Sequence, residues 1–159
     1  MNGIDTLREA FTNALAGELC SQEQLCLARA LAHSRNKNER IWANGVILCA
    51  GPANQREEAL GALEQGLREG NLKVGERFDM MAILLQARRQ IAFKPALKEF
   101  IVQMASAPEP ELRCNATIVL SELAELDPGA VRVLGELAGD SNASVRHNAA
   151  ALLKRLSGK

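Results

Sequence analysis

The stretch DSNASVRHNAAALLKRL at residues 140–156 decides the fold. Its apolar side chains recur at Val145, Ala149, Leu152, Leu153 and Leu156, the spacing of one face of an α-helix. The residues before this face are of the kinds that end one helix and cap the next. We therefore predict an amphipathic helix over residues 142–157.

The same pattern occurs three more times, and each copy opens with an arginine. The copies begin at Arg40, Arg77, Arg113 and Arg146, at intervals of 37, 36 and 33 residues, and a weaker copy begins at Arg8. In the four copies from Arg40 on, the side chains three, six, seven and ten residues after the arginine are apolar, which predicts a buried stripe. Two and nine residues after it the side chains are mostly polar, and they define a second stripe of Trp42, Cys49, Asp79, Gln86, Asn115, Glu122, Asn148 and Arg155.

Glycine and proline breaks divide the whole chain into helical segments. We predict helices over residues 4–18, 21–34, 37–50, 53–69, 74–90, 95–106, 109–126, 128–138 and 142–157. Ser21 followed by Gln24 is a capping-box pattern, and Asp127 before Pro128 places a cap before a proline at the first helical position. No segment alternates with period two over the length of a strand. The predicted fold class is therefore all-α.

The last copy of the pattern resembles the second helix of HEAT repeats. Asp140 in the turn and Arg146 six residues later match two positions that, in that family, lie close between neighbouring repeats and pair in a ladder. Ala107, Asn71 and Ser34 stand at the aspartate position of the other three copies. The repeats are shorter than the roughly 40–47 residues of HEAT and armadillo units. They are closer to the compact HEAT-like units of bacterial proteins and phycobilin lyases. The resemblance implies a right-handed α-α superhelix, a HEAT-like solenoid of about nine helices in four to five repeats, whose second helices line the concave side.

Length and composition fit one folded domain. The chain has 159 residues, of which 47% are hydrophobic and 24% are charged, enough to bury a full core. We predict a single domain over residues 1–159, with an N-terminal capping helix in residues 1–20 and helix-pair repeats at 21–50, 53–90, 95–126 and 128–157. Stacking neighbouring pairs completes the core, because one pair cannot bury its apolar stripe alone.

Charge and cysteine content limit the class of partner. The chain has 19 Lys and Arg against 19 Asp and Glu, whereas nucleic-acid binding usually depends on a basic excess. Cys20, Cys26, Cys49 and Cys114 form no C-x-x-C pair, so we expect reduced thiols and not a disulfide or a metal site. Residues 1–19 do not resemble a signal peptide, and no apolar run is long enough to span a membrane. We expect a cytoplasmic protein with no membrane partner.

No set of residues predicts a reaction. His33 and His147 are the only histidines, and we expect solvated or helix-capping roles for them. The pairs Glu57–Glu58 and Glu109–Glu111 lie at helix starts, where carboxylates usually stabilise the helix dipole. Glycine-rich phosphate loops are absent from the sequence. We therefore expect no catalytic residue, no metal, no cofactor and no enzymatic activity.

Two basic clusters are the candidates for an anion site. Arg35, Lys37 and Arg40 form one, and Arg88 with Arg89 forms the other. Neither is interleaved with aromatic residues, which favours a solvated face. For the repeat arginines we expect a structural role, in a ladder made of Arg40, Arg77, Arg113, Asp140 and Arg146.

The second stripe is the predicted binding surface. We expect a non-catalytic scaffold or adaptor, either a monomer or a subunit of a larger complex, that binds another protein along its concave face through Trp42, Asp79, Gln86, Asn115, Glu122, Asn148 and Arg155. Trp42 has two interpretations: an interface hot spot, or a residue packed under the helices at 4–18 and 21–34. Fold analogy alone suggests two alternative functions, nucleic-acid binding as in HEAT-like DNA glycosylases and a phycobilin-lyase-type subunit.

Overall fold

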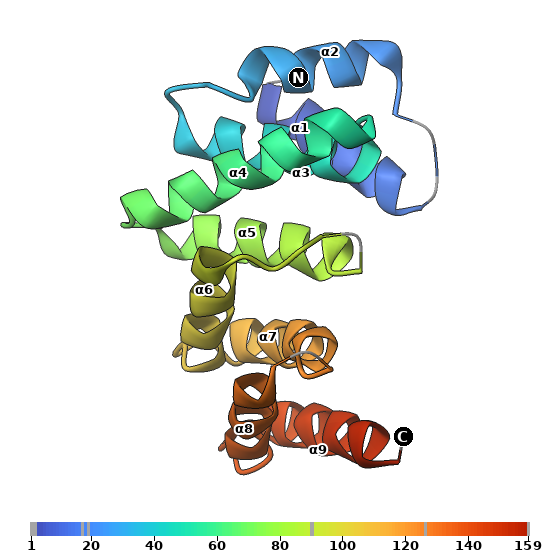
Figure 1. The fold of residues 1–159 in the computed structure, drawn as a ribbon. Helices are drawn as coiled ribbons and strands as arrows, with labels where there is room; N and C mark the ends of the chain where they lie inside the picture. The colour runs from blue at the N-terminus through green and yellow to red at the C-terminus, as the bar shows by residue number, and fades with distance from the viewer. Residues whose placement is uncertain (1–2, 17, 19, 90, 126, 159) are drawn as a thin grey trace. The chain divides into compact units, whose positions relative to one another are not determined.

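The computed structural model describes residues 3–16, 18, 20–89, 91–125 and 127–158. These residues form nine α-helices and no strand (Figure 1): α1 (Gly3–Leu15), α2 (Gln22–Leu31), α3 (Lys37–Ala50), α4 (Ala53–Glu69), α5 (Val74–Ala87), α6 (Pro95–Ala105), α7 (Pro110–Leu123), α8 (Pro128–Leu137) and α9 (Ala143–Ser157). The all-α prediction is confirmed for this part of the chain. Residues 17, 90 and 126, which the predicted first, fifth and seventh helices include, lie outside the described residues.

Side chains at the helix starts bind backbone N–H groups that have no partner within the helix. Ser21 Oγ accepts from the Gln24 N–H at 3.1 Å, and Gln24 Oε1 accepts from the Ser21 N–H at 2.9 Å, so the predicted capping box is confirmed. The Asp127 carboxylate accepts from the N–H two residues later, at 2.9 Å, and Pro128 opens α8. Asn142 caps α9. These contacts are local, which explains why the sequence predicted the helix bounds closely.

The helices form two compact units, Met1–Ala87 and Arg88–Lys159, and each is described by itself. The single domain over residues 1–159 stays a prediction. In the first unit α3 is central, since it packs against α1, α2, α4 and α5. A Cβ at Gly45 would lie 2.6 Å from Ile83 Cδ1, so the missing side chain of Gly45 lets α5 approach α3.

In the second unit α7 is central, and it packs against α6, α8 and α9. The core of this unit is aliphatic apart from Phe100. Its buried side chains include Leu97, Phe100, Ile101, Met104, Leu112, Ala116, Val119, Leu120, Leu123, Leu134, Val145 and Ala149.

The predicted apolar stripe is buried in α3, α5 and α7, apart from half-buried Ala50. In α9 the result differs from the prediction. Ala149 is fully buried, but Leu152, Leu153 and Leu156 are only half-buried. Among the described helices only α7 and α8 make extensive contact with α9, so the outer half of its stripe is only partly covered.

Candidate interaction surface

Each repeat arginine binds the turn that precedes its own helix. Nη1 of Arg40, Arg113 and Arg146 donates to the backbone carbonyl six residues earlier, at 2.9, 2.8 and 2.7 Å. Arg113 and Arg146 also reach the carbonyl five residues earlier, both at 2.8 Å. Arg77 donates from Nε to the Leu72 carbonyl at 3.2 Å. These bonds fasten each turn to the helix that follows, because a guanidinium group holds several donors in a fixed fork.

Two of these arginines also bind a carboxylate of the following helix pair. Nε and Nη2 of Arg113 donate to both oxygens of Asp140 at 2.7 and 2.9 Å, and the two side chains are only 12% and 10% exposed. Arg40 Nη2 donates to Glu69 at 3.1 Å in a more exposed pair. The carboxylate of Asp140 thus forms its ion pair with Arg113. Arg146, which the sequence suggested as its partner, hydrogen-bonds the backbone carbonyl of Asp140 instead.

The Arg113 contact also changes the acidity of Asp140. The hydrogen bond from Arg113 has the largest effect and holds the pKa of Asp140 below its ordinary value. The hydrogen bond from the backbone N–H of Asn142 acts in the same direction. Hydrogen bonds to the charged form of a carboxyl favour that form. Asp140 is therefore a charged anchor between the α6–α7 pair and the α8–α9 pair.

In the first unit α1 covers Trp42, the first residue of the second stripe. Trp42 is 7% exposed, and its ring meets Phe11 edge-on with 5.3 Å between the ring centroids. The guanidinium carbon of Arg8 lies 5.3 Å from the Trp42 ring centroid, and Arg8 Nη2 lies 3.5 Å from Asp79 Oδ2. Trp42 is therefore a core residue under the first helix, so it is not an exposed anchor for a partner. Of the predicted stripe residues in this unit, Gln86 is exposed.

In the second unit the stripe is open. We name it the open stripe and define it as Asn115, Glu122, Asn148 and Arg155, of which Arg155 is exposed and the others are half-buried. Asn148 Nδ2 donates to Cys114 Sγ at 3.4 Å, and Arg155 Nη2 donates to Ser121 Oγ at 3.4 Å. Both bonds run from α9 to α7, so they align polar side chains across two neighbouring helices.

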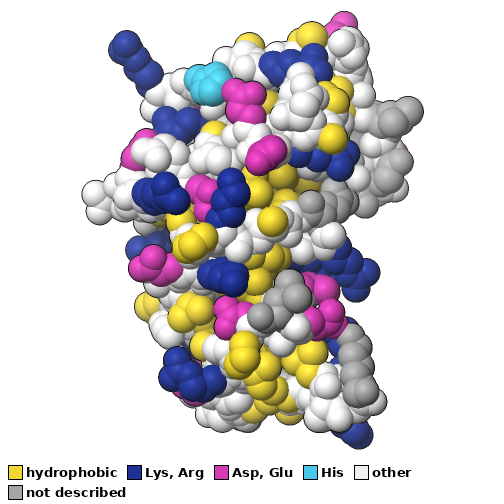
Figure 2. Space-filling view, viewed as in Figure 1, with side chains coloured by type: hydrophobic (Ala, Val, Ile, Leu, Met, Phe, Trp, Pro, Cys, Tyr) yellow, Lys and Arg dark blue, Asp and Glu magenta, His cyan; other side chains and the backbone are white. Residues whose placement is uncertain are grey.

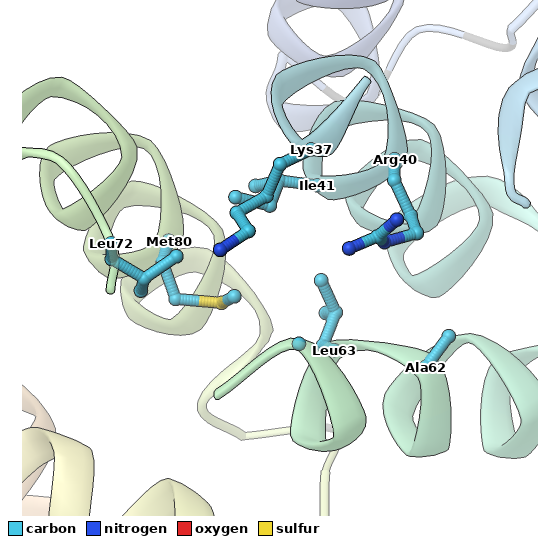
Figure 3. Close-up of a pocket in the computed structure, with 8 residues that line it drawn as sticks. Lys37, Arg40, Ile41, Ala62, Leu63, Leu72 and Met80 are labelled. Carbon is cyan, nitrogen blue, oxygen red and sulfur yellow. The ribbon is translucent and has the colours of Figure 1, made fainter. Parts of the chain in front are cut away.

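Two of the three residues of the first basic cluster, Lys37 and Arg40, bind the end of α4, and Arg35 is exposed. Lys37 Nζ donates to the Gly70 carbonyl at 3.0 Å, next to the bond between Arg40 and Glu69. Figure 3 shows the Lys37 and Arg40 nitrogens directed toward a pocket with apolar walls that include Leu63. Its volume is about 10 Å³, which holds at most one water molecule. Lys37 and Arg40 thus bind a helix end and do not form an open anion site.

The second basic cluster surrounds a carboxylate of the open stripe. Nε of Arg88 and Nε of Arg89 lie 3.6 and 3.4 Å from Glu122 Oε1. The Arg89 side chain is 71% exposed, whereas those of Arg88 and Glu122 are about one quarter exposed. Both arginines therefore set the position and the electrostatic environment of Glu122.

The titratable groups outside these contacts do not form a recognisable reaction centre. His33 is 77% exposed and lies 3.9 Å from Glu58, and His147 is exposed. Within the described ranges, no group of three or more His, Cys, Asp or Glu side chains could hold a metal ion. Burial raises the pKa of Cys49 to about 11, which makes its thiol a poor nucleophile near neutral pH. We assign no catalytic role to these groups.

The sequence alone did not identify three residues that contact the second stripe. Arg8 was visible only as the start of a weaker repeat copy, and its contact with Asp79 joins distant parts of the chain. Cys114 and Ser121 each precede a stripe residue by one position, which is the signal that could have found them.

Comparisons with known proteins identified no relative. No helix in the described part of the chain is long and apolar enough to cross a membrane. No protein-family model, curated protein or solved structure matches the chain. The resemblance to HEAT repeats therefore stays a prediction, based on the repeat frame.

Proposed function

We propose that this chain is a non-catalytic, HEAT-like α-α superhelical protein that binds another protein through the open stripe of α7 and α9. The observation that supports this most is the pair of bonds that holds Asn148 and Arg155 against α7. Side chains that are held before binding lose less conformational entropy when a partner docks. The protein acts as a scaffold or adaptor.

The chemistry of the open stripe fits a polar protein surface. It presents two amides, one carboxylate and one guanidinium, a mixture that hydrogen-bonds backbone and side-chain groups of either polarity. A nucleic acid would bring its phosphates against Glu122, and the nearby Arg88 and Arg89 already bind that carboxylate. Protein is therefore the favoured partner over nucleic acid, and no observation favours a lyase role.

Partner recovery by three forms of the full-length chain tests the proposal. Each form carries an affinity tag and is incubated with native lysate, and the retained proteins are identified by mass spectrometry. The stripe variant combines Glu122→Lys with Arg155→Glu. The control combines Glu99→Lys with Arg132→Glu at exposed positions of α6 and α8, so both variants keep the net charge.

We expect wild type and control to retain the same protein, and the stripe variant to retain at least about five-fold less of it. Loss of a hot-spot residue costs more than about 1 kcal/mol, which is about a five-fold loss of affinity. Far-ultraviolet circular dichroism should be the same for all three. Equal recovery by all three would show that the open stripe is not the binding surface.

A further inference from the structure

A small cleft lies over α3 in the first unit, between the end of α2 and the start of α4. Both of these helices pack on α3, and they make little direct contact with each other. The cleft has a volume of about 180 Å³. Its floor consists of buried residues, which are Ala32, Asn44, Ile47 and Ala59, and its rim consists of Arg29, His33, Gln55 and Glu58.

Asn44 brings a hydrogen-bond acceptor to the floor of the cleft. The residue is only 2% exposed, and its Nδ2 donates to the carbonyls of Ala32 and Arg40 at 2.9 and 2.8 Å. Both amide hydrogens are thus used, so the group that Asn44 offers to the cleft is Oδ1. Within the described residues, no hydrogen bond uses this oxygen. A ligand donor can therefore bind Oδ1 without displacing a contact of the fold.

The rim carries a cation and an anion whose binding capacity the fold leaves mostly unused. Arg29 Nε donates to Gln55 Oε1 at 3.0 Å, and His33 Nε2 lies 3.9 Å from Glu58 Oε1, beyond hydrogen-bond distance. Figure 2 shows a histidine beside an acidic side chain in the part of the view where Figure 1 places α2. In the part of the chain that the structure describes, no partner binds Nη1 or Nη2 of Arg29, and no donor hydrogen-bonds the Glu58 carboxylate.

The two charges of the rim lie about one helical turn apart. Gln55 and Glu58 are three residues apart on α4, so they share one side of the helix with a rise of about 4.5 Å between them. Arg29 is bonded to Gln55, which places its guanidinium group about one turn from the Glu58 carboxylate. A molecule that carries a carboxylate and an ammonium group on one carbon atom can bridge these two side chains.

The size and the charges of the cleft limit the class of ligand. Pockets for drug-sized ligands have roughly 300–1,000 Å³. The cleft has about 180 Å³, equal to the volume of about six water molecules in the liquid, so a nucleotide does not fit. A simple anion would meet the like charge of Glu58, and a simple amine would meet that of Arg29. A small zwitterion satisfies both.

We propose that the cleft binds a free aliphatic α-amino acid, of the size of valine or leucine, as a zwitterion. The carboxylate accepts from the Nη groups of Arg29, and the ammonium group donates to Glu58 and to Asn44 Oδ1. The aliphatic side chain packs against Ile47 and Ala59. The proposal does not rest on the open stripe, because every residue that lines the cleft belongs to the first unit.

Titration of the full chain with L-leucine, followed by amide NMR, tests the proposal. The backbone N–H of Ala59 and the side-chain NH₂ of Asn44 report from the floor of the cleft. Two analogues of leucine each lack one charge. Isopentylamine has the ammonium group without the carboxylate, and isocaproate has the carboxylate without the ammonium group. They separate recognition of a zwitterion from recognition of a single charge.

We expect saturable shifts of both signals with a Kd of about 1 mM, since a small ligand in an open cleft gains little net free energy. Each analogue should bind at least about tenfold more weakly than leucine, because it lacks one charge-assisted contact. Arg29→Gln and Glu58→Gln should each weaken leucine binding at least about fivefold. Both side chains are exposed, so the circular dichroism signal should not change. The matched controls, Arg35→Gln and Glu57→Gln at exposed positions outside the cleft, should keep the wild-type Kd.

Three outcomes would overturn the proposal. The first is that neither leucine nor valine gives saturable shifts in the millimolar range. The second is that isopentylamine or isocaproate binds as tightly as leucine, which would make the ligand an amine or a carboxylic acid. The third is that leucine binds Arg29→Gln and Glu58→Gln with the wild-type Kd, which would place its site elsewhere on the chain.

Discussion

The two units use one repeat frame in different ways. In Met1–Ala87 the stripe residue Trp42 is buried under α1, and Arg8 of α1 contacts both Trp42 and Asp79. In Arg88–Lys159 the same frame positions hold Asn115 and Asn148, which remain accessible. Helix α1 therefore makes one position of the second stripe, Trp42, part of the core, whereas the stripe of the second unit lies at the surface.

The ion pairs of the repeat arginines also differ between the two units. The pair of Arg113 and Asp140 is bidentate and only 12% and 10% exposed, whereas the pair of Arg40 and Glu69 has one bond and is 24% and 46% exposed. From these contacts we expect the first unit to depend more on the cover of Trp42 by α1, and the second to depend more on a partly buried ion pair. Substitutions can test this division.

Removal of the Trp42 side chain should give the largest effect. We expect Trp42→Ala to lower the free energy of unfolding by about 4 kcal/mol, because it leaves a cavity under α1 beside Phe11. Urea denaturation followed by circular dichroism measures the loss. Gln86→Ala, at an exposed position of the same stripe, should change stability by less than about 0.5 kcal/mol.

In the wild type, the Trp42 fluorescence should be blue-shifted and should resist acrylamide quenching, as expected for a side chain that is 7% exposed. A red-shifted, quenchable Trp42 together with a loss below about 1 kcal/mol would mean that α1 does not cover the stripe.

The two ion pairs should differ in the cost of losing their carboxylate. Asp140→Asn should lower the free energy of unfolding by about 2 kcal/mol, because it leaves Arg113 partly buried with weaker acceptors. Glu69→Gln should cost less than about 1 kcal/mol, since solvent screens the more exposed pair with Arg40. Urea titrations of both variants provide the comparison. Equal losses would remove the distinction between the two units.

Acid should weaken the second unit through Asp140. Its pKa is lowered in the folded state by Arg113, so its carboxylate stabilises the fold above the unfolded-state value of about 3.9. That contribution is lost as the pH falls through the lower, folded value. The stability difference between wild type and Asp140→Asn should therefore be constant from pH 7 to about 5 and shrink below about pH 4.

Unfolding free energies at each pH measure this dependence. Glu57→Gln, at an exposed position of α4, is the matched control. A difference between wild type and Asp140→Asn that persists at pH 2 would mean that the charge of Asp140 does not stabilise the fold.

The helices were predictable because their signals are local. The caps at Ser21, Asp127 and Asn142 act within three residues, and prolines and glycines mark the breaks. The buried stripe of α3, α5 and α7 was predictable for the same reason, since helical periodicity alone defines it.

The sequence left two interpretations of Trp42 open, and it could not decide between them because the answer depends on contacts between distant residues. Trp42 is buried by Arg8 and Phe11, which belong to another helix. The Asp140 carboxylate binds Arg113, 27 residues earlier, whereas nearby Arg146 binds the backbone carbonyl of Asp140. Periodicity states which side of a helix is apolar, but it does not state whether another helix covers that side.

Thiol reactivity gives a smaller test of the same contrast. Cys49 is a stripe position in the first unit, and burial raises its pKa to about 11, so only about one thiol in a thousand is ionised at pH 8. Exposed Cys26 has no such cover. We expect iodoacetamide at pH 8 to alkylate Cys26 at least ten times faster than Cys49, as measured by peptide mass spectrometry. The Cys49 rate should rise about tenfold per pH unit up to pH 10, because the thiolate is the reactive form. Comparable rates for the two thiols at pH 8 would show that the stripe around Cys49 is as open as that of the second unit.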